Sequence, residues 1–484
     1  MTILLILIGI IFILNTILAI ITVFRQPRDI SATWAWLLVL ILLPIIGFIF
    51  YLFTGRGLSK NKIFTMQKQI KDGITAKIHV QKQENAAKRL LPSQELLPES
   101  SELVNLFLSL DKAPLTKNNS VEIITDGHKK FEMLFHDIIM AKDSIHIEYY
   151  TIYNDQLGNR LMNILKQKAQ EGVEINVLYD AWGSHGINKQ WWEQLRNLGG
   201  HVKPFFTSKH PVTDFRLNYR DHRKIVVIDG KIGYVGGFNI GDQYLGDSKK
   251  FGYWRDTHLR ILGEAVASLQ IHFNMDWNAS ADENEKLSYN DKYFPKISDA
   301  PGNVNIQIVS SGPNDELEQI KMGYLKMISS ATNSIWIQSP YLIPDDSIID
   351  TLKAAALSGI DVRIMIPDMP DHPFIYRATQ YYAQLLHKNN VRIFLYKNGF
   401  LHSKTFLIDK HISSVGTANL DIRSFKLNFE INAFIYDSNV ANSLYNIFLN
   451  DLKVSQELTD EMINNQSYWL KFKQHFSRLL SPIL

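Results

Sequence analysis

Two short stretches of the chain, DHRKIVVIDG and HSKTFLID, share the same spacing of histidine, lysine and aspartate. The residues are His222, Lys224 and Asp229 in the first stretch and His402, Lys404 and Asp409 in the second. Alternate side chains of a β-strand point to the same face, so each histidine is expected to lie beside its lysine. One such pair is usually a solvated surface feature, but a base and a cation at the mouth of a buried strand are costly unless they are used.

The match between the two stretches continues downstream. A glycine and an asparagine follow each histidine at the same offsets, as Gly236 and Asn239 in the first stretch and Gly416 and Asn419 in the second. Five positions therefore agree in register over eighteen residues. This agreement indicates an internal repeat that carries chemistry.

This set of side chains is suited to reaction at a phosphodiester. One histidine, as a neutral imidazole, can attack phosphorus, while the other gives a proton to the leaving alkoxide and later takes one from the incoming alcohol. The lysines, with Asn239 and Asn419, can donate hydrogen bonds to the non-bridging oxygens as negative charge develops. Because the lysines supply positive charge, the chemistry needs no divalent ion and no other cofactor.

A histidine nucleophile needs a carboxylate to hold its second ring nitrogen. Each repeat offers one in a strand-like segment, Asp256 in WRDTHL and Glu430 in NFEINAF. We therefore expect each carboxylate to lie beside the histidine of its own repeat. Asp229 and Asp409 have the opposite strand parity to the histidines, so we expect them to fix the turn after the strand rather than take a direct chemical role.

The composition limits the class of protein. A chain of 484 residues is long enough for two or three domains with full cores. Lysine and arginine together number 51 against 48 acidic residues, and this near balance argues against nucleic acid as a partner. The absence of cysteine excludes disulfides, thiolate metal sites and cysteine nucleophiles.

Residues 1–54 are predicted to form a transmembrane hairpin. The uncharged runs 3–24 and 34–53 are each long enough to span a bilayer as a helix. A cleaved signal peptide is a poor fit to the first run, which is too long, lacks a basic leading segment and is followed at once by the second run. Five basic residues follow the second run before the first acid, so we expect a two-span protein of the cell membrane with its catalytic domains on the cytoplasmic side.

The rest of the chain is predicted to be a linker and two α/β domains. Residues 55–118 are polar and contain two Leu-Pro breaks, which is typical of a linker. Beyond them, apolar strands alternate with helices twice in the same order, which predicts a mixed sheet covered on both faces. The junctions QEGVEINVL and LSGIDVRIM each place a glycine at a helix C-terminus. We expect a first domain at 119–295 and a second at 296–484.

The second domain is predicted to end in an amphipathic helix within SYWLKFKQHFSRLLSPIL. Its apolar and polar residues separate by helical face. The apolar face holds Trp469, Phe472, Phe476, Leu479 and Leu480, while Lys471, Gln474 and Arg478 lie off it. Such a helix either docks on the catalytic core or lies in the membrane interface, and the sequence leaves both open.

The paired H-x-K-x4-D patterns, each followed by G-x-x-N, resemble the phospholipase D superfamily. The stretches HRKIVVIDGKIGYVGGFNIGDQYLG with WRDTHLRI, and HSKTFLID with SSVGTANLDIRSFKLNFEINAFIYD, are more specifically similar to the bacterial cardiolipin synthases, as is the hairpin ending in LPIIGFIFYLFTGR. The resemblance covers nearly the whole chain. It implies an α/β fold of two similar phospholipase D-like α/β/α domains that share one active site.

The resemblance also implies a reaction, the reversible transfer of a phosphatidyl group between two phosphatidylglycerol molecules through a phosphohistidine. The products would be cardiolipin and glycerol, with no metal. It assigns the nucleophile to His222 and the acid/base to His402. The implied catalytic set is the two His–Lys–Asp triplets, supported by Asn239, Asp256, Asn419 and Glu430. One departure is that the broader G-S/T-x-N pattern has Gly237 in the first half against Thr417 in the second, which puts a symmetric role of this position in doubt.

Three other functions compete with this one. A membrane-anchored phospholipase D that only hydrolyses would use the same intermediate, so the sequence does not exclude it. A phosphodiesterase or nuclease of the same superfamily is disfavoured by the hairpin and the near-neutral charge. A non-catalytic membrane scaffold has no use for two complete His–Lys pairs. The sequence also leaves a homo-oligomer open.

Further histidines and aromatic residues have weaker claims to the site. His146, His185 and His258 lack the helical spacing of a metal site, so we expect them on the surface or in the core. Four aromatic residues follow strand ends and line either the lipid headgroup pocket or the core. They are Tyr149, Tyr150, Tyr153 and Trp182.

Overall fold

The computed structural model describes residues 98–110, 113–205, 219–296, 300–313 and 317–481, with short pieces at 13, 16–17, 37–40, 42–43 and 80–84. The chain divides into two compact units, one formed by Met1–Phe64 with Phe206–Tyr219 and the other by Thr65–Phe205 with Arg220–Leu484. The predicted spans 3–24 and 34–53 lie almost wholly outside the described residues. Within the residues that are described, no helix is both long and apolar enough to cross a bilayer. Both His–Lys motifs lie in the second unit.

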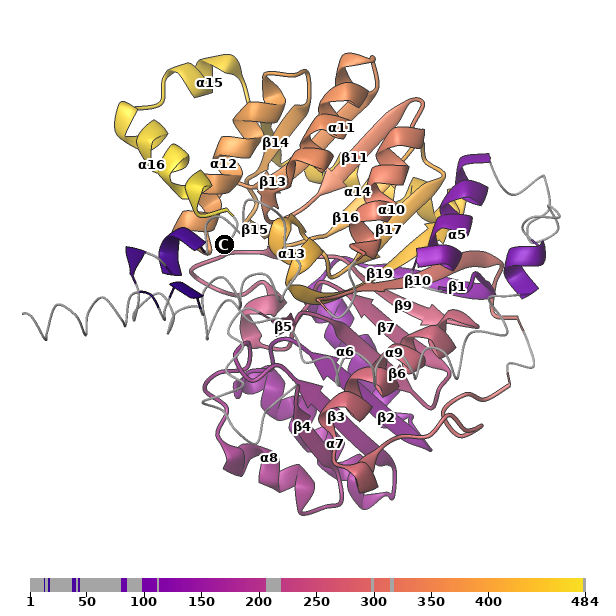
Figure 1. Ribbon diagram of the computed structural model, residues 1–484. Coiled ribbons are helices and arrows are strands. Elements are labelled where there is room, and N and C mark those ends of the chain that lie inside the picture. Colours follow the sequence, from indigo (N-terminus) through magenta and orange to yellow (C-terminus); the bar gives the residue numbers. More distant parts are fainter. Residues whose placement is uncertain are drawn as a thin grey trace, which may run out of the picture. The chain divides into compact units, whose positions relative to one another are not determined.

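One mixed sheet of sixteen strands runs through both halves of this second unit, as far as its residues are described (Figure 1). The strand order is β20-β14-β13-β11-β16-β17-β19-β10-β1-β9-β7-β6-β2-β3-β4, and β5 pairs with β19. Outward from the central pair β10 and β1, the order β19-β17-β16-β11-β13-β14 in one half corresponds to β9-β7-β6-β2-β3-β4 in the other. This correspondence confirms the two similar α/β halves predicted from the repeat.

The strands are short, as expected for elements rich in β-branched residues that alternate with helices. Those of the first half are β1 (Thr116–Ile124), β2 (Ser144–Tyr149), β3 (Glu174–Tyr179), β4 (His201–Pro204), β5 (Arg220–Asp221), β6 (Lys224–Ile228), β7 (Ile232–Gly236), β8 (Trp254–Arg255) and β9 (His258–Leu262). Those of the second half are β10 (Val304–Ser311), β11 (Ser334–Gln338), β12 (Leu342–Ile343), β13 (Asp361–Pro367), β14 (Arg392–Tyr396), β15 (Phe400–Leu401), β16 (Thr405–Ile408), β17 (Ile412–Gly416), β18 (Leu420–Asp421), β19 (Asn428–Tyr436) and β20 (Ser455–Glu457).

Helices cover both faces of the sheet. Along β6, Val226 and Ile228 pack in the core with α6 and α7, whereas Ile225 and Val227 pack in the core with α9 on the opposite face. The helices are α5 (Pro98–Leu110), α6 (Gly127–Ile139), α7 (Gln156–Gln170), α8 (Lys189–Arg196), α9 (Ala265–Ser280), α10 (Gln319–Ser330), α11 (Asp346–Leu357), α12 (Pro373–His387), α13 (Ile422–Lys426), α14 (Ser438–Leu452), α15 (Asp460–Asn464) and α16 (Tyr468–Leu479). In the second half, α10, α11 and α12 share a core on one face, and α14 packs on the other.

The end of the predicted linker belongs to the folded unit. Helix α5 buries Leu103 and Phe107 in the core of the second half, and the ring centroids of Phe107 and Phe434 lie 4.4 Å apart. Strand β1 then begins at Thr116, before the predicted domain boundary at 119. A linker that extends to residue 118 is therefore wrong for its last part, because the apolar residues of α5 are spaced to cover the sheet.

Two helix ends confirm the aligned junctions of the repeat. Gly172 follows α7 and Gly359 follows α11, with φ angles of 87° and 95°. This left-handed conformation favours glycine and reverses the chain after the helix. Each helix can thus lead directly into the next parallel strand, β3 or β13.

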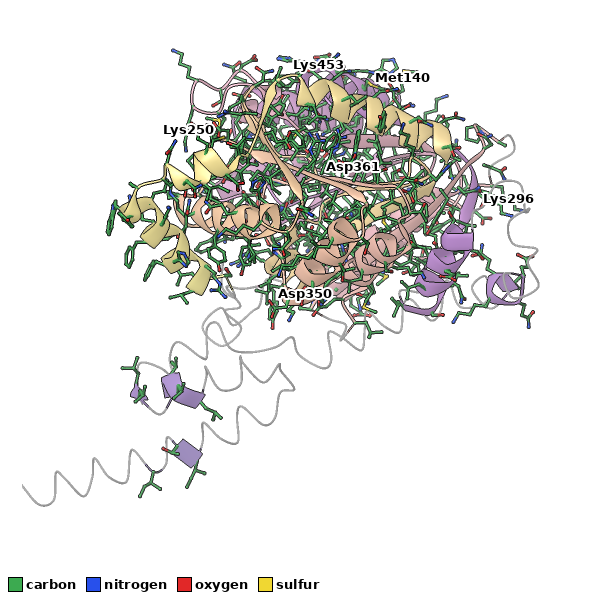
Figure 2. The ribbon with its side chains drawn as sticks, turned by 90° about the horizontal axis from the view of Figure 1, so that it is seen from above. Met140, Lys250, Lys296, Asp350, Asp361 and Lys453 are labelled. Carbon is green, nitrogen blue, oxygen red and sulfur yellow. The ribbon has the colours of Figure 1, made fainter. Side chains whose placement is uncertain are left out.

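The predicted C-terminal helix is present as α16, which packs against α12. Figures 1 and 2 show it beside α12 at the edge of the second half. Docking on the core is therefore confirmed for this helix.

Candidate active site

Each of the two motif histidines is held by a strand of the opposite half. β5 pairs in parallel with β19, and the backbone N–H of His222 donates to the carbonyl of Phe429 over 2.9 Å. In the same way β15 pairs in parallel with β8, and the backbone N–H of His402 donates to the carbonyl of Arg255 over 2.7 Å. Each of these carbonyls directly precedes a carboxylate residue, so each histidine is brought beside the carboxylate of the other half.

The side chains are paired in the same crossed way. Nδ1 of His222 lies 3.0 Å from both carboxylate oxygens of Glu430, and Nδ1 of His402 lies 2.6 Å from Oδ2 of Asp256. The expectation that each carboxylate serves the histidine of its own repeat is therefore wrong. The reason is that the short strands β5 and β15 leave their own half of the sheet and add to strands of the opposite half.

Nδ1 of each imidazole is bonded to a carboxylate, so Nε2 is the ring nitrogen that is left to meet a substrate. Burial lowers the pKa of His222 to about 4, against the opposing effect of Glu430. Burial, and then the charge of Lys404, lowers the pKa of His402. The lysine of the other half also lowers the pKa of each histidine, so the two His–Lys pairs share one electrostatic environment.

Both motif lysines are buried beside their histidines. Nζ of Lys224 donates to the backbone carbonyl of His222 over 2.7 Å, and Nζ of Lys404 donates to that of His402. Burial lowers the pKa of Lys224 to about 7 and that of Lys404 to about 8. Two buried cations that hold their protons this weakly would be stabilised by an anionic ligand such as a phosphate.

The two carboxylates are kept ionised by their surroundings. Burial alone would raise the pKa of the Glu430 carboxyl, but its interaction with His222, including the hydrogen bond from the imidazole, and the charge of Lys224 lower it below its ordinary value. His402 and Lys404 overcome burial in the same way and lower the pKa of Asp256. Both side chains therefore remain acceptors for the imidazole N–H at neutral pH.

The two halves hold their carboxylates differently. Glu430 accepts hydrogen bonds from the hydroxyl of Thr417 over 2.5 Å and from Nδ2 of Asn428 over 3.2 Å. Asp256 instead accepts from the backbone N–H of Thr257 over 2.7 Å. At the position equivalent to Thr417, a Cβ on Gly237 would lie 2.0 Å from Oδ1 of Asp256. The departure seen in the sequence thus has a steric cause, since the Asp256 carboxylate fills the space of a side chain.

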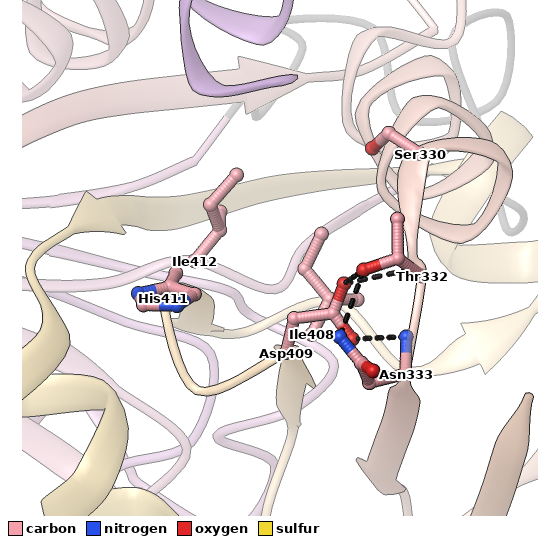
Figure 3. Close-up of a pocket in the computed structure, with 7 residues that line it drawn as sticks. All are labelled: Ser330, Thr332, Asn333, Ile408, Asp409, His411 and Ile412. Carbon is pink, nitrogen blue, oxygen red and sulfur yellow. Dashed lines mark hydrogen bonds between the residues drawn. The ribbon is translucent and has the colours of Figure 1, made fainter. Parts of the chain in front are cut away.

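Asp229 and Asp409 fix turns, as their strand parity predicted. Each carboxylate accepts hydrogen bonds from three consecutive backbone N–H groups, those of residues 142–144 for Asp229 and 332–334 for Asp409. Their φ angles of 52° and 49° turn the chain after β6 and β16. Figure 3 shows Asp409 directed at Thr332 and Asn333. The resemblance placed both aspartates in the catalytic set, but they lie at the strand ends away from the histidines, so that assignment is corrected.

Asn239 and Asn419 lie at the edge of the sheet that carries the histidines. They follow β7 and β17, which are antiparallel to β6 and β16, so the chain returns to the end of the sheet at which the His–Lys motifs stand. Oδ1 of Asn239 accepts from the backbone N–H of Thr151 over 3.2 Å, and this orients the amide. Nδ2 of the same amide is a hydrogen-bond donor.

A buried charge cluster beside the first motif was not predicted. The Arg223 guanidinium is paired with Asp276 and donates from Nε to the carbonyl of Glu430 over 3.2 Å. Burial, followed by the charges of neighbouring carboxylates, raises the pKa of both Glu148 and Asp221. The signal was present in the motif, because an arginine between the histidine and the lysine points to the opposite face of the strand.

In the second half an uncharged residue stands at the position of this arginine. Ser403 occupies the position between His402 and Lys404, and its hydroxyl lies 2.7 Å from that of Thr257 in the first half. The contact again joins the two halves across the site. Only the side that holds His222 is therefore backed by the charge cluster of Arg223.

Among the four aromatic candidates, Tyr150 is the one placed against a motif histidine. Its ring lies edge-on to that of His222 at 5.1 Å, and Nζ of Lys224 lies 5.5 Å from its centroid. Trp182 is largely exposed, with the Arg220 guanidinium 5.2 Å from its ring. Tyr149 is a core residue whose hydroxyl accepts a hydrogen bond from a lysine, and Tyr153 is half-buried.

The three histidines with weaker claims to the site, His146, His185 and His258, occupy core or surface positions, as expected. His146 is fully buried, stacks on Phe273 at 4.7 Å and is bonded to Gln270. His258 is fully buried in β9. His185 is exposed, with Nδ1 3.0 Å from a backbone carbonyl.

Two similar α/β halves with crossed histidine–carboxylate pairs define a phospholipase D-like protein. The family model described as "Cardiolipin synthase, PLD-like domain" matches residues 134–277 and 324–452, and the one described as "Phospholipase_D-nuclease N-terminal" matches residues 13–56. The chain belongs to the cardiolipin synthase family.

Curated relatives cover nearly the whole chain. A cardiolipin synthase of Listeria monocytogenes is 52% identical over 475 residues, which are 98% of each chain. One of Staphylococcus aureus is 51% identical over 473 residues, 98% of this chain and 95% of its own. The crystal structure of phosphatidylserine synthase from Haemophilus influenzae superposes with a TM-score of 0.60 at 16% identity, over 79% of this chain and 100% of that one. That likeness shows the shared fold.

Proposed function

We propose that the chain joins two phosphatidylglycerol molecules into cardiolipin and glycerol through a phosphohistidine. The observation that carries the proposal is the crossed pairing of two histidines, each with a buried lysine, in a member of the cardiolipin synthase family. A displacement in two steps needs one nucleophile and one acid/base. The two halves supply these two imidazoles in one environment.

In the first step we assign the nucleophile to His222. Its Nδ1–H is held by Glu430, so Nε2 carries the lone pair that attacks phosphorus. The P–N bond forms, the P–O bond to the departing glycerol breaks, and His402 gives its proton to the glycerol oxygen. The negative charge of the bound phosphate raises the pKa of His402 and lets it carry that proton.

In the second step the same histidine acts as a base. His402, now neutral, takes the proton from the acceptor's glycerol hydroxyl, and the alkoxide oxygen attacks phosphorus. The P–N bond breaks, cardiolipin leaves, and His222 is regenerated. Lys224 and Lys404 stabilise the negative charge on the non-bridging oxygens in both steps, and Asn239 and Asn419 donate to the same oxygens in this proposal. The two lysines supply the positive charge for which other phosphoryl-transfer enzymes use a metal ion.

The substrates of this reaction are membrane lipids, and the match of residues 13–56 to the phospholipase D-nuclease N-terminal family fits a membrane-associated protein. We propose that the two uncharged runs, 3–24 and 34–53, anchor the chain as a hairpin with the catalytic halves in the cytoplasm. Anchoring holds the site at the surface where donor and acceptor lipids are both concentrated. We expect no nucleic acid partner, given the near balance of charges.

The proposal is tested by the products of the purified full-length chain acting on vesicles of labelled phosphatidylglycerol. We expect cardiolipin and free glycerol as the main products, with phosphatidic acid minor. Because donor and acceptor are chemically alike, added glycerol should reverse the reaction and suppress net cardiolipin. A chelator should not change the rate. Phosphatidic acid as the main product, with no effect of glycerol, would show a hydrolase instead.

The roles of the histidines are tested separately. H222A and H402A should each lose turnover, because neither imidazole can replace the other in its role. Acid-quenched wild-type enzyme, digested and mapped by mass spectrometry, should carry the phosphoryl group on His222. Its recovery on His402 would reverse the assignment of nucleophile and acid/base.

A further inference from the structure

Helix α16 is docked on α12 through its polar face. Gln474 and Ser477 are each 2% exposed. The Gln474 side chain bonds both Gln380 and Gln384 of α12 at 3.2 Å. The Arg478 guanidinium lies 5.0 Å from the ring of Tyr381 on the same helix. An amphipathic helix that packs on a protein core usually buries its apolar face, so this orientation is reversed.

The apolar face of α16 is consequently turned outward. Trp469, Phe472, Phe476 and Leu479, here called the α16 ridge, are 63%, 56%, 47% and 73% exposed. The rings of Trp469 and Phe472 stack at 5.3 Å, and those of Phe472 and Phe476 at 6.3 Å. A contiguous apolar surface of large side chains is unfavourable in water and marks a surface that binds an apolar partner.

The charge of α16 indicates the chemistry of that partner. The helix YWLKFKQHFSRL contains two lysines, an arginine and a histidine, and it contains no acidic residue. Nζ of Lys473 lies 5.3 Å from the ring of Trp469, so a cation adjoins the ridge itself. Aromatic residues flanked by cations fit the interface of a bilayer rich in anionic lipid. A second copy of the helix would instead place like charges together.

The position of α12 relates the ridge to the active site. Strands β11 and β13 are parallel, and Gln338, at the end of β11, stands opposite Thr405, which follows Lys404. The carboxyl ends of these strands therefore lie at the edge of the sheet that carries the second motif. Helix α12 starts at that edge, because it begins at Pro373, shortly after β13 ends at Pro367.

We propose that the α16 ridge inserts into the interface of the anionic bilayer and orients the catalytic halves on the membrane surface. The proposal rests on the proposed function in one respect, since that function makes the substrates bilayer lipids. The polar face holds the helix on the protein and leaves the aromatic residues to the lipid. The ridge is then a second membrane contact, far in sequence from the predicted hairpin.

The chain has no cysteine, so a single cysteine can report the surroundings of the ridge in the full-length protein. F472C carries an environment-sensitive fluorophore in vesicles of phosphatidylglycerol and phosphatidylcholine. The matched control is D350C on α11 of the same half, where the side chain is 75% exposed. We expect a nitroxide on the lipid headgroup region to quench the label at 472 and aqueous iodide to quench the label at 350. Equal access of iodide to both labels would overturn the proposal.

A third result would also overturn it, namely a label at 472 that is shielded from both quenchers. Protein would then cover the ridge, either another part of this chain or a second copy. The fluorescence readout needs no turnover, so it stands even if the chain makes no cardiolipin. Conversely, cardiolipin formation together with an iodide-accessible ridge would refute only the membrane contact.

A second pair of variants tests the consequence for catalysis. In W469S/F472S, we expect the ratio of turnover on phosphatidylglycerol vesicles to turnover on phosphatidylglycerol in detergent micelles to fall severalfold. In D350S the ratio should keep its wild-type value. The docking residues of α16 are untouched in both, and an unchanged melting temperature checks that the fold is retained. An unchanged ratio in W469S/F472S would contradict the proposed role.

Discussion

The hydroxyl of Thr417 donates a 2.5 Å hydrogen bond to Oε2 of Glu430, the carboxylate that holds His222. The corresponding position of the first half is Gly237, where the Asp256 carboxylate occupies the space of a side chain. A duplicated site has therefore become unequal at the atoms that orient its two imidazoles. His222 is thus held by the more extensively bonded carboxylate, which suits its proposed role as the nucleophile that forms a covalent intermediate.

This inequality predicts different costs for T417A and T417S. Hydrogen bonds to charged groups contribute about 1.5–3 kcal/mol, so losing the hydroxyl in T417A should lower kcat/KM by about tenfold or more. T417S keeps the donor and should stay close to wild type. Initial rates of cardiolipin formation measure both. Equal activity of T417A and T417S would show that the bond does not contribute to orienting His222.

The crossed pairing predicts which residues are energetically coupled. In double-mutant cycles of thermal stability, His222 with Glu430 and His402 with Asp256 should couple by about 0.5–3 kcal/mol, as contacting residues do. The uncrossed pair of His222 with Asp256 should show a smaller coupling. Alanine variants followed by calorimetry in detergent provide the measurement. A coupling that is larger within a repeat than between repeats would contradict the crossed arrangement.

The buried lysines predict a pH dependence of stability. In the folded chain the pKa of Lys224 is lowered to about 7 and that of Lys404 to about 8, against 10.5 for an ordinary lysine. Between these values the unfolded chain binds more protons, so these groups make the free energy of unfolding rise with pH from about 7 to 10.5. K224M/K404M should show a smaller rise than wild type in melting temperatures taken over that range. Parallel curves for the two proteins would refute the lowered pKa values.

The same lysines predict how activity depends on pH. Loss of their protons removes the positive charge that we propose binds phosphate, so kcat/KM of the wild type should fall as pH rises above about 7 to 8. A bound phosphate stabilises the protonated lysines, so kcat should fall only at higher pH. Rates at low and saturating lipid, measured across this pH range, separate the two parameters. A kcat/KM that stays constant to pH 10 would be inconsistent with this role.

The cluster around Arg223 predicts that removing the arginine charge and replacing Glu148 by a neutral amide affect stability differently. R223M leaves buried carboxylates without their cation and should destabilise the fold by about 3–5 kcal/mol. Burial, and then the charges of Asp221 and Asp276, raises the pKa of Glu148 well above its ordinary value, so below that raised pKa its carboxyl carries a proton and E148Q should change stability little. As the pH rises through the folded pKa, wild type should lose stability that E148Q retains. Melting temperatures of both variants test this, and a tolerated R223M would contradict it.

The sequence predicted those features that depend on local pattern. Strand parity placed each histidine beside its lysine and gave Asp229 and Asp409 a different orientation. These aspartates follow the far ends of β6 and β16, where their carboxylates accept hydrogen bonds from backbone N–H groups. The repeat predicted two matching halves. These properties follow from spacing along a single strand or from similarity between two segments, and both can be read without knowing the neighbours of a strand.

The crossed pairing could not be predicted in this way. Parity and spacing say which side chains share a strand face, but not that β5 would pair with β19 of the other half. The reversed docking of α16 is a second case. Its apolar face was evident, yet the face that packs depends on Gln380 and Gln384, which stand far away in the sequence and meet Gln474 only in the fold.

The pairing of strands between the halves has a consequence for the synthesis of the enzyme. When a ribosome has completed the first half, His222 has been synthesised, but β19 with Glu430 has not. The first half does contain Asp256, whose histidine is made only later. Neither motif histidine of a nascent chain therefore has its carboxylate partner until the second half has been made and its strands have joined the sheet. If these pairs act as proposed, newly made protein gains activity only when its synthesis is nearly finished.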